Sequence, residues 1–155
     1  MNLRIEISKD PCILASLNQD VQDAHVHLEP ASFKPYHYET ILEDMKTFLR
    51  QDGSLAIVAW DGDTPIGYAM LQPKKHPDTP YRPEYDFMSL DQMSVRSEYR
   101  RQGIGTRLIE KVMEISRERG IRRIELTVWT SNSDALHFYE HMGFNAIIQR
   151  QRLDF

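Results

Sequence analysis

The spacing of apolar side chains divides the first third of the sequence into one strand and two helices. Residues 3–7 alternate apolar and polar side chains, as a half-buried strand does. Apolar residues then recur at helical spacing over 13–28, after an Asp10-Pro11 pair that is typical of a helix start. A second amphipathic helix is predicted over 38–49.

A β-hairpin is predicted in the middle of the chain. Two apolar runs, 54–60 and 65–72, flank the segment 61–64, whose Asp-Gly-Asp-Thr sequence is a strong turn signal. The four prolines of residues 73–83 predict an exposed loop, and residues 86–95 predict the next strand.

The last third of the sequence continues the alternation of helix and strand. A helix is predicted over 104–119 with Gly120 just beyond its end, followed by a strand over 121–128. A short helix over 133–142 and a final strand over 144–153 complete the pattern. This order predicts a single mixed α/β domain, residues 1–155, with a central sheet flanked by helices.

Composition restricts the class of protein further. The 155 residues carry 23 acidic and 19 basic side chains and one cysteine, which excludes an internal disulfide. No apolar run is long enough to cross a bilayer, and the first residues lack a secretion signal, so we expect a cytoplasmic protein with no membrane contact.

The charge is unevenly distributed along the chain: residues 1–91 have a net charge of −7 and residues 92–155 have one of +3. Helix faces that divide the charges by chance would give the same asymmetry.

The segment 95–106 has the pattern of an anion site. It leaves a predicted strand, passes through a basic turn and enters a helix, whose first N–H groups bind phosphate well. Gly103 and Gly105 allow the backbone to approach a ligand closely. Leu108 stands where a dinucleotide fingerprint needs glycine or alanine, and no Walker loop is present. The alternative is a glycine-rich turn whose arginines face water.

Two motifs in order resemble those of the GCN5-related N-acetyltransferase family. The first is Arg100-Arg101-Gln102-Gly103-Ile104-Gly105, and the second comprises Asn132, Ala135, Phe138-Tyr139 and Gly143-Phe144. The resemblance covers about residues 54–148. It implies a mainly antiparallel sheet that is splayed at the fourth strand, and a site for acetyl-CoA with no metal ion.

The resemblance also implies how the cofactor is held. Arg100 would fix the turn, and the backbone of Met93, Ser94 and Val95 would hydrogen-bond the pantetheine arm. Asn132 would either contact the pantetheine or only cap the short helix, a position that favours asparagine. The pyrophosphate would be bound by the loop amides of Arg101, Gln102, Gly103, Ile104, Gly105 and Thr106.

Tyr139 and Asp91 are the predicted catalytic residues. A phenol is protonated at neutral pH, so Tyr139 can donate a proton to the departing thiolate of coenzyme A. Asp91 lies four residues before Val95 and shares its strand face if no bulge intervenes, so it is the predicted base, acting directly or through water. Glu29, Glu84 and Asp86 are alternatives that would recognise a cationic substrate.

The sequence therefore predicts an acetyl-CoA-dependent N-acetyltransferase that acts by direct transfer in a ternary complex. The acidic first half suggests a cationic acceptor, either a small molecule or a peptide amine, and the resemblance suggests a homodimer. The alternative is a non-catalytic coenzyme A-binding module of the same fold.

Nucleic-acid binding is not expected, because the net charge is −4 and no nucleic-acid motif occurs. His137 and His141 share a helix face but lack the glutamate of a zinc-protease motif, so no metal is expected.

Overall fold

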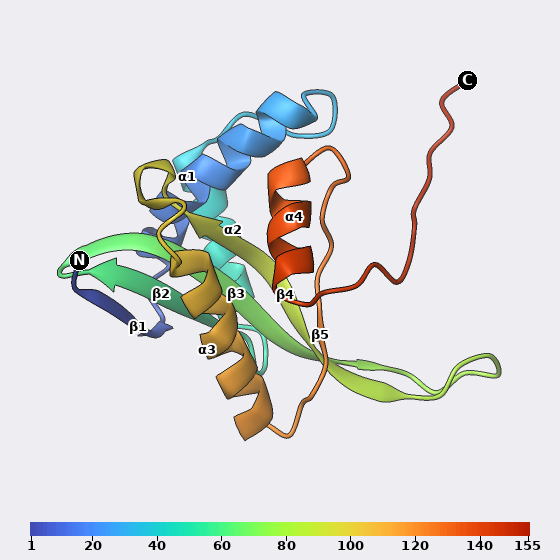
Figure 1. Cartoon of the computed structure of the whole chain (residues 1–155). Helices are drawn as coiled ribbons and strands as arrows, with labels where there is room; N and C mark the ends of the chain where they lie inside the picture. Colours follow the sequence, from blue (N-terminus) through green and yellow to red (C-terminus); the bar gives the residue numbers. More distant parts are fainter.

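A five-stranded sheet forms the centre of the computed structural model, which describes residues 1–155 (Figure 1). The strands lie in the sheet in sequence order, with antiparallel neighbours from the first strand to the fourth and a parallel pair at the end. The strands are β1 (Leu3–Ser8), β2 (Leu55–Asp61), β3 (Thr64–His76), β4 (Tyr85–Val95) and β5 (Ile124–Glu125). The predicted mixed, mainly antiparallel sheet is confirmed.

Helices cover both faces of this sheet. On one face lie α1 (Pro11–Leu28) and α2 (Tyr38–Leu49); on the other lie α3 (Ile104–Glu118) and α4 (Ser133–His141). The start of α1 follows from its sequence, because the Asp10 side chain accepts a hydrogen bond from the Cys12 N–H and Pro11 occupies the first turn. None of the four helices is both long and apolar enough to span a bilayer.

Two apolar clusters hold the layers together, one on each side of the sheet. Strand β2 contributes to both: Ile57 packs with the α3 residues Leu108 and Val112, whereas Val58 packs towards α1 and α2 with Leu14. Alternate side chains of a strand point to opposite faces, which explains why β2 is apolar at consecutive positions. Burial of each large side chain stabilises the fold by about 1.5–3 kcal/mol.

A β-bulge interrupts β4 at Asp91. Met70 of β3 pairs with Gln92 and Leu71 pairs with Leu90, so Asp91 has no partner on the neighbouring strand. One extra residue changes which positions face α3, and Leu90 and Met93 therefore both pack against the α3 cluster although they are three residues apart.

A buried polar network lies directly after the bulge. Tyr68 donates a hydrogen bond of 2.8 Å to the Gln92 side-chain oxygen, and the Asn18 amide donates to both of these groups at 3.1 Å. Asn18 belongs to α1, so the network ties that helix to β3 and to the displaced part of β4. Buried polar groups are retained where they are paired, and here they fix the position of the bulged strand.

The sheet opens between β4 and β5. Only Met88 and Ser89 of β4 pair with β5, through Ile124 and Glu125, and the two strands then separate (Figure 1). The expected splay at the fourth strand is therefore confirmed. It leaves the β5-facing edge of the last residues of β4 without a neighbouring strand.

Three predicted boundaries were wrong, each because strand pairing depends on distant partners. The strand predicted over 121–128 contains only Ile124–Glu125, since β4 moves away after two pairs. The final strand predicted over 144–153 does not form, because no strand of the chain lies beside it. The loop predicted over 73–83 is shorter, because β3 continues to His76. Pro73 is tolerated there because β2 ends at Leu55, opposite Leu71, and leaves that edge of β3 free.

Candidate active site

The anion loop predicted from the sequence leads directly into the first turn of α3. Gly103 precedes this helix with a φ of 80°, and no side chain caps its N-terminus. Arg101, with a φ of 63°, is the one non-glycine residue in the left-handed region. The first N–H groups of a helix have no partner within it, so the amides that follow Gly103 are available to an anion.

Contacts with α1 and with the end of β4 hold this loop in place. The Ser97 N–H donates a hydrogen bond of 2.8 Å to Asp20 of α1, at the start of the short 3-10 turn Ser97–Tyr99. The Arg100 Nε donates to the Val95 carbonyl at 3.1 Å, which ties the loop to the end of β4. Asp20 has no motif around it in the sequence, so only its position in the fold identifies it as a loop-holding residue.

The end of β4 presents free backbone groups to the opening in the sheet. The Arg96 N–H bonds to the Ile66 carbonyl of β3, at 2.8 Å. Because alternate residues of a strand direct their backbone groups to opposite sides, those of Met93 and Val95 point away from β3 and towards the opening. Ser94 lies between them, opposite Tyr68, so its backbone groups point towards β3.

The bulge at Asp91 is the reason that these odd-numbered residues face the opening. Before the bulge, the even-numbered Met88 directs its N–H towards β5 and bonds to the Arg123 carbonyl at 2.8 Å. The extra residue reverses the alternation, so that the open edge passes to Met93 and Val95.

Tyr139 lies in α4 within a group of aromatic rings beside this opening. Its ring centroid is 5.3 Å from that of Phe138 and 5.5 Å from that of Phe144. Burial raises the pKa of the Tyr139 phenol to about 12. The hydroxyl is therefore protonated at neutral pH. Tyr139 also lines a groove of about 1340 Å³ between α3, β5 and the residues that follow α4.

The two sequence motifs meet in space at Gly105. A Cβ built on this glycine would lie 3.1 Å from the Phe138 ring, which is tighter than an ordinary van der Waals contact. The absence of a side chain at Gly105 thus lets α4 approach the first turn of α3. This contact couples the position of the anion loop to that of Tyr139, the neighbour of Phe138.

We expect Gly105→Val to lower the free energy of unfolding by about 1–3 kcal/mol, because its methyl groups would overlap the Phe138 ring. Gly105→Ala is the matched control: its single methyl requires the ring to move only slightly, and we expect a loss below about 1 kcal/mol. Urea unfolding followed by circular dichroism measures both. Equal losses in the two variants would contradict the proposed packing.

Asn132 occupies the N-cap of α4. Its side-chain oxygen accepts a hydrogen bond of 3.2 Å from the Ala135 N–H. This is the capping alternative that the sequence left open, and it accounts for asparagine at this position. Contact between Asn132 and pantetheine stays a prediction.

Asp91 does not share the strand face of Val95, because the bulge intervenes. Its carboxylate accepts a hydrogen bond from Ser89 and lies 3.9 Å from Lys74 Nζ, whereas Met93 and Val95 pack against the α3 cluster. Asp91 still lines the same groove as Tyr139. Its role as a base therefore stays a prediction, with a geometry that differs from the one expected.

Of the three alternative carboxylates, Glu29 follows α1, and Glu84 and Asp86 lie farther along the β3–β4 hairpin. Glu84 and Asp86 lie 3.4 Å and 3.9 Å from Lys75 Nζ. Asp86 precedes Met93 by seven residues, which corresponds to roughly 20 Å along an extended strand. These two side chains are therefore remote from the open end of β4.

An aromatic contact that the sequence did not predict closes the side of the site formed by α1. Phe33, which follows α1, stacks on His25 with a centroid distance of 4.5 Å and meets Trp129 edge-on at 5.3 Å. Trp129 lies between β5 and α4, so this contact joins two loops that border the opening of the sheet. Its sequence signal is weak, because the two aromatic residues lie 96 positions apart.

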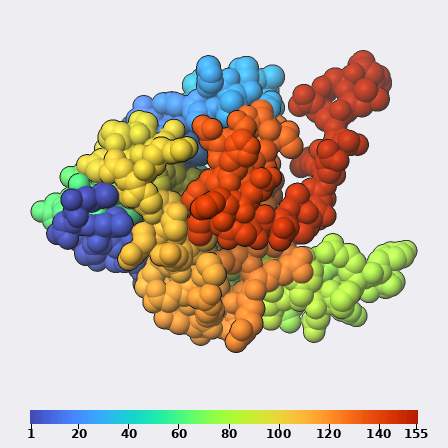
Figure 2. All heavy atoms as spheres, viewed as in Figure 1, coloured from blue at the N-terminus to red at the C-terminus, as the bar shows by residue number.

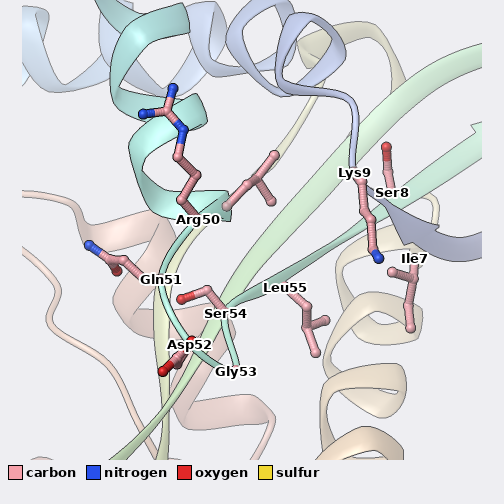
Figure 3. Close-up of a pocket in the computed structure, with 10 residues that line it drawn as sticks. Ile7, Ser8, Lys9, Arg50, Gln51, Asp52, Gly53, Ser54 and Leu55 are labelled. Carbon is pink, nitrogen blue, oxygen red and sulfur yellow. The ribbon is translucent and has the colours of Figure 1, made fainter.

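A second hollow, far from these residues, lacks the features of a catalytic site. It measures about 430 Å³ and lies between the end of β1 and the α2–β2 turn. Figure 3 shows that the side chains of Lys9 and Arg50 point apart, and no group of acids and bases converges on the space. The candidate site is therefore the opening between β4 and β5.

Stability should fall at alkaline pH because of the buried tyrosines. Burial raises the pKa of Tyr139 to about 12 and also raises that of Tyr68 above the ordinary 10.0. Above pH 10 the unfolded chain loses these protons first, so the free energy of unfolding decreases as the pH rises. Below pH 10 this contribution is fully present. Urea unfolding between pH 8 and 11 tests this, and Tyr139→Phe should reduce the slope; an unchanged slope would contradict the assignment.

Comparison with known proteins agrees with this arrangement. The model of the Acetyltransferase (GNAT) family matches residues 15–144. N-alpha-acetyltransferase 30 of Schizosaccharomyces pombe is 30% identical over 116 residues, which are 75% of this chain and 68% of that protein. The [Ribosomal protein bS18]-alanine N-acetyltransferase of Escherichia coli is 38% identical over 66 residues, 42% of this chain and 45% of that enzyme.

The fold is shared with solved structures as well. The crystal structure of a tetramutant of the BH1408 protein from Bacillus halodurans superposes with a TM-score of 0.89, covers 100% of both chains and is 21% identical. The ordered motifs, the splayed sheet and the matched family model lead to one conclusion. This chain belongs to the acetyltransferase (GNAT) family and is an N-acetyltransferase.

Proposed function

We propose that this N-acetyltransferase moves an acetyl group from acetyl-CoA directly to a primary amine, in a ternary complex. The proposal rests on three features at the splay: the Met93 backbone and the Val95 N–H without a neighbouring strand, the uncapped start of α3, and the groove lined by Tyr139. We further propose that the protein acts in the cytoplasm and as a homodimer.

The residues at the splay fit acetyl-CoA. The cofactor supplies an activated acetyl thioester and a pyrophosphate. The amides after Gly103, with Arg101 and Gln102 beside them, would hold the pyrophosphate through the partial positive charge of the helix start. The Met93 backbone and the Val95 N–H would hold the pantetheine as an added strand would be held. The Val95 carbonyl is already engaged by Arg100.

Tyr139 is the proposed general acid. Its hydroxyl is protonated at neutral pH, and burial beside Phe138 and Phe144 keeps it so. Donation of this proton to the departing sulfur makes the thiol a better leaving group than the thiolate. Asp91 is the proposed base, through a water molecule rather than directly, because Ser89 and Lys74 hold its carboxylate.

We expect Asp91→Asn to remove the acidic limb of the pH–kcat/KM profile, because an amide cannot accept the proton that the substrate's ammonium group must lose before the amine attacks. Initial rates between pH 5.5 and 9 measure this. Asp86→Asn is the matched control, since Asp86 lies on the same strand but pairs with Lys75 on the hairpin. If the limb persists in Asp91→Asn, another group or bulk water is the base.

A cationic acceptor is the proposed substrate class, and the amine is carried by a small molecule or by the N-terminus of a peptide. The first 91 residues carry a balance of −7, and they include α1, whose Asp20 accepts a hydrogen bond from Ser97 just after β4. Two relatives support the peptide alternative by their names, N-alpha-acetyltransferase 30 and ribosomal bS18-alanine N-acetyltransferase. The first name describes acetylation at an α-amine, and the second describes N-acetylation of an alanine of a ribosomal protein.

Thiol release from acetyl-CoA, measured over a panel of amines, tests this proposal. The panel should pair each cationic amine with a neutral analogue, and peptides with free N-termini with their blocked forms. We expect release with cationic small amines or with free peptide N-termini. Release with neutral amines alone would contradict the acceptor class. Binding of acetyl-CoA without release in any mixture would favour the non-catalytic coenzyme A-binding module.

A further inference from the structure

Gln92 is the member of the buried network beside the bulge that reaches solvent. Asn18 and Tyr68 are buried, with 3% and 0% of their surface exposed, whereas Gln92 is half-buried. The Gln92 Oε1 accepts two hydrogen bonds, and the Gln92 Nε2 has no partner in the chain. Four buried side-chain atoms also lack a partner, and the Gln92 Nε2 is not one of them, so it is accessible. Its two N–H groups are therefore free to donate to a ligand.

The two buried side chains behind Gln92 fix the direction of its amide. Burial raises the pKa of the Tyr68 phenol, so this hydroxyl keeps its hydrogen and donates it to the Gln92 Oε1. The Asn18 amide uses both of its hydrogens, one on the same oxygen and one on the Tyr68 hydroxyl. Only an acceptor, the Asn18 Oδ1, has no partner. Reversed amides would leave both hydrogens of Asn18 buried without an acceptor, which is the costlier arrangement.

Gln92 projects from the face of the sheet that α1 covers. It bonds to Asn18 of α1, whereas the next residue, Met93, packs against the α3 cluster on the opposite face, as does Tyr139, the proposed acid. The departing sulfur would thus lie towards α3 and α4, and the amine would approach the acetyl group from the side of α1. Figure 2 shows the end of α1 and the loop after it (blue) beside the start of α4 (orange-red), close to the contact between Phe33 and Trp129.

The proposed base lies on the same face of β4 as Gln92. Met88 and Leu90 are buried in the α3 cluster, so Ser89 between them points to the other face. The Asp91 carboxylate accepts a hydrogen bond from Ser89 and therefore lies on that face too. Neighbouring residues of β4 thus present a proton acceptor and a free hydrogen-bond donor to the approaching amine.

We propose that the Gln92 Nε2 donates a hydrogen bond to the carbonyl oxygen beside the acceptor's amine, and so selects the N-terminus of a peptide over a simple alkyl amine. The inference rests on the proposed acetyl transfer and names the acceptor of that same site. Both lone pairs of the Gln92 Oε1 are occupied, so this side chain offers only donors and does not bind the ammonium group itself.

The chemistry of a peptide N-terminus matches this pair of groups. A single carbon separates its α-amine from its first carbonyl, so the carbonyl oxygen would meet Gln92 while the amine gives its proton towards Asp91. An alkyl amine has no such oxygen and leaves the fixed donor unpaired. A site built for a hydrogen bond strongly disfavours a substrate that lacks the partner group.

A matched pair of peptides tests the hydrogen bond in the unaltered protein. Alanyl-alaninamide is compared with its thioamide analogue, in which sulfur, a weaker acceptor, replaces the first carbonyl oxygen. We expect kcat/KM, measured by thiol release at saturating acetyl-CoA, to be about 5-fold to 10-fold lower for the thioamide, the effect of one lost hydrogen bond. Equal values for the two peptides would overturn the proposal, whatever any variant shows.

Gln92→Glu removes the donor but keeps an oxygen for Tyr68 and Asn18. We expect kcat/KM for alanyl-alaninamide to fall about 10-fold and the difference between the two peptides to disappear. The value for isopropylamine should not fall, because a carboxylate attracts the ammonium group. Gln51→Glu is the matched control: Gln51 is exposed in the α2–β2 turn, its oxygen accepts a hydrogen bond of 2.7 Å from Gln72, and the variant should keep the wild-type preference.

The three acceptors also separate this inference from the proposed function. An equal loss for alanyl-alaninamide and isopropylamine in Gln92→Glu would show a purely structural role for Gln92 and would overturn the proposal. Release by the wild type with isopropylamine but with neither peptide would overturn the carbonyl contact and leave acetyl transfer standing. No release with any of the three, by a protein that binds acetyl-CoA, would overturn both.

Discussion

Tyr139→Phe is expected to lower kcat by about 100-fold, the effect typical of losing a general acid. Phenylalanine keeps the ring contacts with Phe138 and Phe144, so the packing of α4 is retained and only the hydroxyl is lost. The dissociation constant for acetyl-CoA should change by less than about twofold, because the effect is confined to the chemical step. Single-turnover thiol release and calorimetric titration measure the two quantities.

Tyr81→Phe is the control for loss of a tyrosine hydroxyl. Tyr81 lies at the tip of the β3–β4 hairpin and is 92% exposed. The kcat of the Tyr81→Phe variant should therefore equal that of the wild type. An acetyl donor whose leaving thiol is more acidic than that of coenzyme A should reduce the effect of Tyr139→Phe, because such a thiol departs without protonation. An unchanged kcat in Tyr139→Phe would remove the acid role and leave Tyr139 as a packing residue.

The helices and the β2–β3 hairpin were predictable because local signals and burial agree there. Asp10 and Pro11 start α1 through short-range contacts, and the apolar spacing of 13–28 matches the face that packs on the sheet. The Asp-Gly turn between β2 and β3 places two apolar runs side by side without help from distant residues. In such segments the structure depends on residues that are close in the sequence, so the sequence pattern is enough to predict it.

The bulge, the short β5 and the absence of a strand over residues 144–153 were not predictable in the same way. The bulge at Asp91 depends on the pairing of Met70 and Leu71 across the sheet, and nothing in the apolar pattern marks the extra residue. Whether β5 continues beyond two residues, and whether residues 144–153 form a strand, depends on the presence of a neighbouring strand. A sequence with high β-propensity shows only that a segment is able to form a strand. The strand forms when a neighbouring strand supplies its hydrogen bonds.

The same distinction between local signals and distant contacts separates the site residues that the sequence identified from those that it missed. Gly103 and Gly105 were identified from the sequence, since a glycine turn at a helix start has a direct physical purpose. Asp20 and Trp129 were not, because each acts through a contact with a residue far away in the sequence. Asp91 was predicted as the base because it lies four residues before Val95. The bulge at Asp91 places its side chain on a different face of the strand from that of Val95.

Gly103→Val is expected to weaken acetyl-CoA binding by about 10-fold to 100-fold, the cost of one or two charge-assisted hydrogen bonds. Gly103 has a φ of 80°, a region that a β-branched residue avoids. To relieve this strain the loop must rotate, which turns the amides at the start of α3 away from the pyrophosphate. Nothing lies within 4 Å of a Cβ at this position, so the effect comes from the backbone and not from a clash.

Gly62→Val separates backbone strain from loss of the anion site. Gly62, in the β2–β3 turn, also has a positive φ, of 59°, and also has open space around a Cβ. Both variants should lose stability by about 1–2 kcal/mol, because both place a side chain in the left-handed region. Only Gly103→Val should raise the dissociation constant for acetyl-CoA. If the two variants bind acetyl-CoA equally well, the start of α3 is not the pyrophosphate site, and the glycines of the loop serve only the turn.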